Sequence, residues 1–181
     1  MHDHRKSLKV FQEGVVIPAT PLALTSDRKI DEYTQRLLMR YYLNAGSGGI
    51  ATAVHSTQFA IRSFGMFEPL ISIVSEEIDK FEQQTGTSKI KICGACGPTE
   101  QAVNETRLAK KHGFDAVLLS PGGLNNMSEY YMIDRTKAVS EILPVIGFYL
   151  QNAVGGRIFS YDYWKRTAAV EGVIGIKCAS F

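Results

Sequence analysis

Apolar and polar positions alternate along the chain in blocks that predict strands and helices by turns. Short runs rich in β-branched and other apolar residues predict strands, whereas the longer segments between them repeat apolar residues at helical spacing, and several of these end at glycine. The pattern predicts six strands and five helices. We expect strands over residues 14–20, 48–56, 89–97, 115–121, 144–150 and 172–177, and helices over 31–46, 68–86, 98–113, 128–143 and 160–170.

This alternation predicts a parallel sheet built from βαβ units. The strands are nearly continuous apolar runs, as expected where helices cover the sheet. Two architectures fit, namely an open doubly wound sheet and a (β/α)8 barrel. Residues 17–27, IPATPLALTSD, contain no glycine, so the turn after the first strand lacks the glycine-rich sequence that binds dinucleotides. The barrel is therefore the favoured architecture.

The length of the chain bears on how much of a barrel it contains. A complete barrel typically needs about 250 residues, whereas this chain has 181 and stops on its sixth predicted strand. We expect an α/β fold of the (β/α)8 TIM-barrel type, truncated after about six βα units. Residues 1–13 are predicted to be an N-terminal tail and residues 14–181 a single, partial barrel domain.

Composition narrows the class of protein further. Apolar residues make up 45% of the chain and charged residues 21%, and the net charge of +2 comes from scattered basic residues, so we expect no nucleic-acid partner. The chain has no run of about 18 apolar residues, so no membrane span is expected. Its three cysteines, an odd number, do not predict a disulfide framework. A reducing, cytoplasmic location is expected.

The last predicted strand is an apolar run that ends on a lysine. With a side-chain period of two, Gly175 and Lys177 share one face, so Lys177 is expected to point into the barrel at its C-terminal end, where barrel enzymes carry out their chemistry. On the preceding strand, Gly147 and Tyr149 share a face in the same way. The sequence therefore predicts an amine and a phenol over one cavity.

Such a pair of side chains suits imine chemistry. Withdrawal from water disfavours the charged form of a lysine, so its pKa falls, and the neutral amine can attack a ketone to form an imine. The protonated imine is an electron sink, and a nearby tyrosine can move the protons. The alternative is a lysine at a strand end whose amine reaches solvent. The alternation of side chains along the strand does not distinguish a reactive lysine from one whose amine reaches solvent.

The order of motifs resembles the dihydrodipicolinate synthase / N-acetylneuraminate lyase family of Schiff-base aldolases. The similarity covers about residues 13–181, and the lysine strand together with the tyrosine strand is its specific part. The stretch AGSGGIATAVHSTQF (45–59) stands where the family has a Gly-Thr-Thr-Gly-Glu loop. The other matching stretches are GVVIPATPL (14–22), CGACGPTEQAV (93–103), HGFDAVLLSP (112–121), PVIGFYLQNAVGGR (144–157) and GVIGIKCAS (172–180).

The resemblance implies catalytic roles for three residues. It makes Lys177 the lysine that forms the imine and Tyr149 the tyrosine that passes protons to it. Positions 55 and 56 match the two threonines of the family loop. Ser56 keeps a hydroxyl there, which could hold the keto-acid carboxylate or relay a proton to Tyr149.

Substrate-binding roles follow from the resemblance for three more residues. His55 replaces a loop threonine with an imidazole, a new acid–base group; the alternative is a core histidine bonded to a backbone carbonyl. Thr57 or Gln58 contributes instead if the loop is shifted by one residue. Arg157 matches an arginine that grips a substrate carboxylate, for which a planar guanidinium is suited. The alternative for Arg157 is a surface loop arginine.

Departures from the family pattern point to a divergent member. Gly122 and Gly123 stand where the synthases have a tyrosine pair that reaches into the neighbouring subunit's site, while Tyr130 and Tyr131 fall later, on a predicted helix. Gln58 replaces the loop glutamate. These changes argue against a dihydrodipicolinate synthase proper and favour another acceptor or substrate.

Cofactor and metal chemistry are not expected. Cys93 and Cys96 form a Cys-x-x-Cys sequence, which could be redox-active, but residues three apart on one strand face opposite sides. A zinc site needs two further ligands at suitable spacing, and none is found. The imine itself requires neither a metal nor an organic cofactor.

These observations predict a Schiff-base-forming aldolase, lyase or dehydratase. Its expected substrates are pyruvate or a related 2-keto acid and an aldehyde, and the relatives suggest a homo-oligomer. The alternative from another class is a non-catalytic barrel, truncated or degenerate, with a binding or scaffold role.

Overall fold

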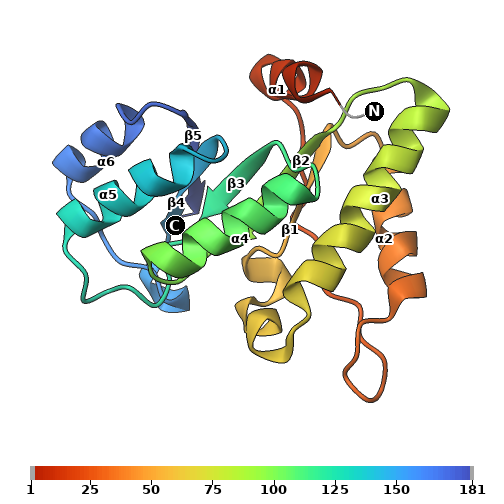
Figure 1. Cartoon of the computed structure of the whole chain (residues 1–181), viewed down its shortest axis with the longest axis horizontal. Helices are drawn as coiled ribbons and strands as arrows, with labels where there is room; N and C mark the ends of the chain where they lie inside the picture. Colours follow the sequence, from red (N-terminus) through yellow and green to blue (C-terminus); the bar gives the residue numbers. More distant parts are fainter. Residues whose placement is uncertain (1–2, 180–181) are drawn as a thin grey trace. The chain divides into compact units, whose positions relative to one another are not determined.

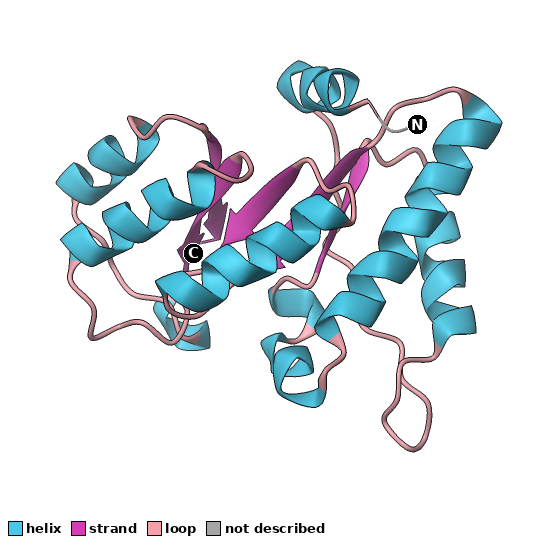
Figure 2. Ribbon diagram, viewed as in Figure 1, coloured by secondary structure: helices cyan, strands magenta, loops and turns pink. Residues whose placement is uncertain are grey.

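The computed structural model describes residues 3–179 and contains a parallel sheet of five strands that alternate with helices (Figures 1 and 2). Strand β1 pairs with β2, β3 with β4, and β4 with β5, each in parallel. The order in the sheet is β1-β2-β3-β4-β5. The strands are β1 Gly49–Thr52, β2 Ile90–Ala95, β3 Ala116–Leu119, β4 Val145–Leu150 and β5 Val173–Ala179.

This strand order decides between the two predicted architectures. In a doubly wound sheet the order reverses at a switch point, whereas in a barrel each strand lies beside the next one in the chain. The observed order follows the chain throughout. The prediction of an α/β fold of the TIM-barrel type is therefore confirmed.

The five predicted helices are all present. Three of them begin at a residue whose side chain accepts a backbone N–H of the first turn, namely Asp31, Ser128 and Ser160. Tyr130 and Tyr131 lie on a helix, as expected. The helices are α1 His4–Glu13, α2 Glu32–Asn44, α3 Phe67–Thr85, α4 Thr99–Lys111, α5 Glu129–Ser140 and α6 Tyr161–Ala168, with short 3-10 helices η1 His55–Thr57, η2 Phe59–Phe64 and η3 Asn152–Val154.

Helix α1 occupies part of the segment predicted to be a tail. The carboxylate of Asp3 accepts the backbone N–H groups of Arg5 and Lys6, which caps the first turn. Nδ1 of His4 lies 2.6 Å from Oδ1 of Asp115, a contact with a residue more than 100 positions away. Within the described residues, the segment predicted to be a tail is therefore helical from His4 to Glu13.

The first predicted strand, residues 14–20, is an extended segment rather than a full strand. It meets β1 at one bridge, between Ala19 and Ala51. The N–H of Ala51 donates to the carbonyl of Pro18 at 3.0 Å, and the N–H of Thr20 donates to the carbonyl of Ala51 at 2.9 Å. Pro18 has no N–H to add to a ladder. The sheet therefore has five strands where six were expected.

The described residues form two compact units. The first unit runs to Cys93 and includes Lys111–Asp115; the second comprises Gly94–Lys110 and the residues from Ala116 onward. In the first unit, α2 packs beside α3 (Figure 1). In the second, α5 packs beside α6. Among residues 3–179, no helix combines the length and the apolar character that a membrane crossing requires.

Each unit has its own apolar interior. In the first unit, α2, β1, α3 and β2 all contribute buried apolar residues. In the second, a cluster joins the β3–α5 loop, α5 and the start of α6. The first interior includes Met39, Leu43, Ile50, Leu70, Ile71, Val74, Ile78 and Ile90, and the second Leu124, Met132, Ile133, Phe159 and Tyr163.

Candidate active site

Lys177 lies near the carboxyl end of β5, on the same face of the sheet as Phe148. The two residues are direct partners in the pairing of β4 with β5, and residues opposite one another on neighbouring strands project to the same side. Nζ of Lys177 lies 5.1 Å from the centroid of the Phe148 ring. The amine therefore faces a phenyl ring.

Tyr149 lies on the opposite face of the sheet from Lys177. Its partner on β5 is Cys178, and its ring centroid lies 5.6 Å from that of Trp164 on α6. Gly147 shares this face, since a Cβ added there would meet Trp164 at 3.6 Å. The prediction that the phenol and the amine lie over one cavity is wrong.

A register shift explains this outcome. Val145 pairs with Val173, but the next residue of β4, Ile146, pairs with Gly175, so Ile174 is an extra residue on β5. Without this bulge, uninterrupted pairing would place Tyr149 opposite the lysine. A shift of one residue moves every later side chain to the other face relative to its neighbour. The bulge therefore replaces a phenol by a phenyl ring beside the amine.

The amine of Lys177 is also more open to water than predicted. The side chain of Lys177 is exposed, whereas Phe148 is only 5% exposed. Within residues 3–179, Lys177 has no hydrogen-bond or ion-pair partner, and its contact is with the ring. It belongs to the last strand in the sheet order, so strand β4 shields it from one side. The predicted shelter from water is not found in this part of the chain.

The predicted loop residues follow β1 in the first unit, on the short helix η1. His55 and Ser56 are exposed, and the His55 ring centroid lies 5.9 Å from that of Phe59, so the alternative of a core histidine is wrong. Thr57 is buried, and its hydroxyl donates to the carbonyl of Thr20 at 2.7 Å. The hydroxyl of Thr57 is thus held by the backbone, while the side chains of His55 and Ser56 are available to a ligand.

Strained backbone flanks this loop. Ala53 has φ of 56° and Gln58 has φ of 78°, in the left-handed region that residues other than glycine rarely adopt. Ala53 is fully buried, and its carbonyl accepts Nη2 of Arg62 at 3.2 Å. Such strain often accompanies functional sites. Neither residue type signals it in the sequence, so sequence reasoning missed it.

A hollow of about 500 Å³ lies beside the loop, within the first unit. Its walls are mainly apolar and include Leu22, Ile61 and Phe64, whereas Ser56 and Arg28 bring polar groups to it. A mostly apolar cavity with a few polar groups is the usual form of a small-molecule site. Ser56 and Gln58, both named for the predicted loop, therefore line a cavity.

Arg157 holds a loop of the second unit. Its Nη1 donates to the carbonyls of Asn125 at 3.0 Å and Met127 at 2.5 Å. The guanidinium carbon lies 4.4 Å from the centroid of the Phe159 ring. These contacts tie the segment after β4 to the β3–α5 loop. They favour the alternative of a loop arginine over a residue that grips a substrate.

A buried arginine that sequence reasoning missed lies on α5. Arg135 is 1% exposed; its Nε donates to the carbonyl of Gly97 at 2.8 Å, and its Nη2 donates to the carbonyl of Ser120 at 3.0 Å. Burial lowers the pKa of the Arg135 guanidinium from its ordinary value. Gly97 follows β2 and Ser120 follows β3, so one side chain joins the carboxyl ends of two strands.

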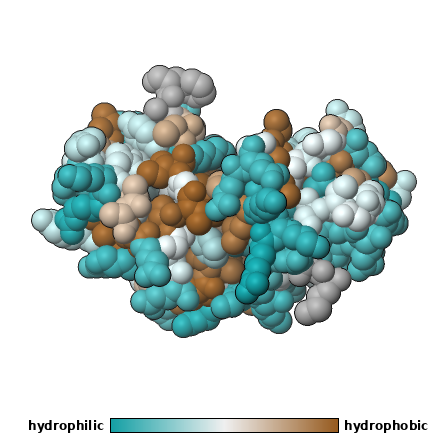
Figure 3. All heavy atoms as spheres, turned by 90° about the horizontal axis from the view of Figure 1, so that it is seen from above, coloured by the Kyte–Doolittle hydropathy of each residue, from teal (hydrophilic) through white to brown (hydrophobic). Residues whose placement is uncertain are grey.

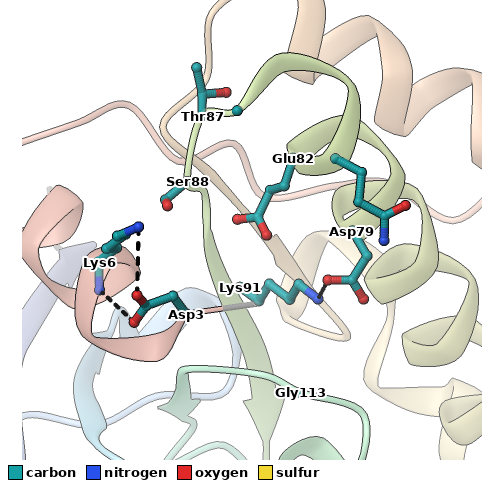
Figure 4. A pocket seen from close by; sticks show the side chains of 10 residues that line it. Asp3, Lys6, Asp79, Glu82, Thr87, Ser88, Lys91 and Gly113 are labelled. Atoms are coloured by element: carbon teal, nitrogen blue, oxygen red, sulfur yellow. Dashed lines mark hydrogen bonds and ion pairs between the residues drawn. The ribbon is translucent and has the colours of Figure 1, made fainter. Parts of the chain in front are cut away.

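A second lysine, Lys91, lies in the first unit near the start of β2. It is fully buried, and its Nζ donates to Oδ1 of Asp79 at 2.7 Å and to Oγ of Ser75 at 2.9 Å. A polar hollow of about 370 Å³ opens beside it, with Glu82 and Lys6 among its lining residues (Figure 4). The amino-terminal side of a barrel supports stability rather than catalysis. Lys91 is therefore a structural lysine.

Neither a disulfide nor a metal cluster is seen in the described part of the chain. Cys93 and Cys96 are both buried, and no disulfide joins them. Residues 3–179 contain no group of three or more histidine, cysteine or acidic side chains arranged to hold a metal ion.

Two curated proteins that share one name are similar to this chain in sequence. The chain is 29% identical to the 4-hydroxy-tetrahydrodipicolinate synthase of Polynucleobacter asymbioticus, over 98% of this chain and 56% of that protein. It is 25% identical to the enzyme of that name from Persephonella marina, over 94% of this chain and 56% of that protein. No protein-family model matches the chain. The chain spans about half the length of the curated relatives it matches.

Solved structures share the fold. Dihydrodipicolinate synthase from Bacillus anthracis aligns with a TM-score of 0.78 at 22% identity, over 98% of this chain and 56% of that one. N-acetylneuraminate lyase from Mycoplasma synoviae aligns with a TM-score of 0.72 at 18% identity, over 90% of this chain and 53% of that one. Both findings agree with the resemblance carried by the sequence motifs. The chain is thus similar in sequence to 4-hydroxy-tetrahydrodipicolinate synthases, and it has the fold of about half of the solved dihydrodipicolinate synthase and N-acetylneuraminate lyase structures.

Proposed function

We propose that this chain carries the lysine of a Schiff-base aldolase, lyase or dehydratase site, and that Lys177 forms an imine with pyruvate or a related 2-keto acid. One observation carries the proposal. The amine lies near the carboxyl end of a barrel-type strand and has no ion-pair or hydrogen-bond partner in the described residues. An amine that compensates no buried charge can give up its proton and act as a nucleophile.

The mechanism begins with attack of the neutral Nζ on the C2 carbonyl of the keto acid. Loss of water gives an imine. Its protonated form withdraws electrons and so weakens the C3–H bond. Loss of a proton from C3 then gives an enamine, which adds to an aldehyde. In the reverse direction, cleavage of a carbon–carbon bond releases pyruvate. These steps use no metal and no organic cofactor.

The loop after β1 is the proposed source of further polar groups. Ser56 offers a hydroxyl and His55 an imidazole, both exposed and both at the carboxyl end of their strand. By resemblance to the family loop, we assign Ser56 and His55 to the binding of the keto acid. Tyr149 has no role in this proposal because it lies on the other face of the sheet. Arg157 has none because its guanidinium is bonded to backbone carbonyls.

The test is covalent trapping. The protein is incubated with pyruvate, reduced with borohydride and digested, and the peptides are identified by mass spectrometry. We expect a carboxyethyl group on Lys177 and none on Lys91, whose amine is bonded to Asp79. Lys177→Arg keeps the positive charge and should abolish the adduct. Modification spread evenly over surface lysines, or its absence from Lys177, would rule the proposal out.

A scaffold role is the second candidate, and exposed apolar side chains favour it. Val16, Phe64, Ile158 and Tyr161 are each more than 70% exposed, and apolar surface is visible among polar side chains on the face drawn in Figure 3. Exposed apolar surface marks association sites where it forms a contiguous patch. Self-association in sedimentation analysis, together with no pyruvate adduct on Lys177, would favour the scaffold. A trapped adduct on Lys177 favours the enzyme. For the enzyme we propose a cytoplasmic location and a homo-oligomer.

A further inference from the structure

We infer that Phe148 is the β4 residue that flanks a substrate bound to Lys177, and that water carries the protons of imine formation there in place of a phenol. This inference rests on the proposed function and makes it more specific. It concerns the second unit alone, because both residues belong to strands β4 and β5 of that unit.

The geometry of the two strands supports Phe148. It is the direct partner of Lys177 across the sheet, and its ring lies 5.1 Å from the amine. At 5% exposure, the ring is held by its surroundings and cannot turn away freely. The hydroxyl of Tyr149 lies on the other face, beside Trp164. A molecule joined to Nζ of Lys177 therefore meets a phenyl ring on the β4 side.

Imine formation requires two proton transfers that a phenyl ring cannot perform. When the Nζ lone pair bonds to C2, the carbonyl oxygen gains a proton and the nitrogen loses one, which gives a carbinolamine. The hydroxyl then takes a second proton and leaves as water while the C=N bond forms. A positioned acid–base group accelerates such steps by about 10²- to 10⁴-fold. Lys177 is exposed, so solvent can supply and remove these protons.

The ring has an effect of its own on charge. The face of an aromatic ring attracts a cation within about 6 Å, and the contact between Nζ and the Phe148 ring meets this condition. The ring therefore stabilises the protonated imine once it has formed. It also gives the bound keto acid an apolar wall. Phe148 thus acts as a positioning residue for the cationic imine.

The first experiment uses the unchanged protein. The rate of pyruvate imine formation at Lys177 is measured by trapping with cyanoborohydride at fixed pH and ionic strength, with rising concentrations of phosphate buffer. If water carries the protons, added buffer shares that task and the rate increases in proportion to buffer concentration. A rate that does not depend on buffer overturns the inference, because an internal group would then move the protons.

The second experiment exchanges the two aromatic side chains one at a time. Phe148→Tyr places a phenol beside the amine and should raise the rate of imine formation by about tenfold or more, with the gain lost above about pH 10 as the phenol ionises. The matched control, Tyr149→Phe, should leave the rate within about twofold. Circular dichroism verifies the fold of both variants. If Tyr149→Phe slows the reaction tenfold, the inference is wrong although the adduct still forms.

The outcomes separate the inference from the proposed function. Absence of any adduct on Lys177 in the unchanged protein contradicts the proposed function. An adduct that forms at a buffer-independent rate and slows in Tyr149→Phe leaves that function standing and contradicts the role given to Phe148.

Discussion

The two units of this chain each place a lysine on a strand of the same sheet, and the two lysines differ in every respect that matters for reactivity. Lys91 lies near the start of β2, is fully buried and donates to a carboxylate 2.7 Å away. Lys177 lies near the end of β5, is exposed and contacts the face of a phenyl ring. A reactive lysine is often expected to be buried. Here the buried amine, that of Lys91, is the one that donates hydrogen bonds to other side chains.

The comparison teaches that the partner of an amine matters as much as its burial. A carboxylate beside an ammonium favours the charged form, which is not nucleophilic. The Asp79 carboxylate and the Ser75 hydroxyl both accept hydrogen bonds from the amine of Lys91. Lys177 has no carboxylate neighbour among the described residues. We therefore expect Lys91 to contribute to the stability of the fold and Lys177 to carry out the reaction.

The largest expected effect on stability comes from removing the partner of Lys91. Asp79→Ala leaves a fully buried ammonium without its carboxylate, and losing one member of a buried ion pair costs about 3–5 kcal/mol. The Asp79 side chain is 38% exposed, so we expect a value near the lower end, about 3 kcal/mol. Urea unfolding followed by circular dichroism measures the change.

A double variant is the control for this result. Lys91→Met removes the buried charge itself and fills similar space, so in the Asp79→Ala background it should restore most of the lost free energy of unfolding. A loss below about 1 kcal/mol for Asp79→Ala alone would contradict the structural role assigned to Lys91.

A comparable effect is expected at another buried charge of the first unit. Burial alone would raise the pKa of the Glu77 carboxyl, but hydrogen bonds from Arg40, Arg36 and Lys80 lower that pKa to about 2. Because the folded pKa lies below the ordinary value of 4.5, the ionised carboxylate stabilises the fold above about pH 4.5. This contribution is lost as the pH falls toward 2.

Glu77→Gln is therefore expected to lower the free energy of unfolding by roughly 3 kcal/mol at pH 7. The difference between the variant and the unchanged protein should shrink steadily between pH 4.5 and pH 2, the interval set by the two pKa values. Denaturant unfolding at a series of pH values tests this. A difference that is constant across that interval would mean that the carboxylate charge contributes little.

The smallest effect on stability is expected at the other lysine. Lys177→Met removes an exposed amine whose contact in the described residues is the Phe148 ring, so the free energy of unfolding should change by no more than about 0.5 kcal/mol. The same substitution should abolish trapping by pyruvate. A loss of several kcal/mol would instead make Lys177 a structural residue like Lys91 and would remove the contrast between them.

Much of the fold was accessible from the sequence because it depends on local patterns. Helical periodicity and terminal glycines located the helices from α2 onward to within a few residues. Helix α1 was missed because most of its residues are polar, although Asp3 is a good cap. The first predicted strand was overextended because one hydrogen-bonded bridge at Ala19 cannot be told from a ladder in the sequence.

The candidate site was less accessible because it depends on how strands pair. Alternation correctly placed Lys177 at the end of its strand, but it describes one strand at a time. The bulge at Ile174 is visible only in the pairing of β4 with β5, and it decides whether Phe148 or Tyr149 meets the amine. The carboxylate partner of Lys91 comes from a different element. No local pattern reports such a contact.

The buried guanidinium of Arg135 has a consequence for motion. It is bonded at once to the carbonyls of Gly97 and Ser120, so neither loop can swing outward without stranding a charge in an apolar interior. The two loops and the helix that carries Arg135 should therefore open to solvent together, as one cooperative patch. Amide hydrogens in both loops should then exchange with deuterium at matching rates.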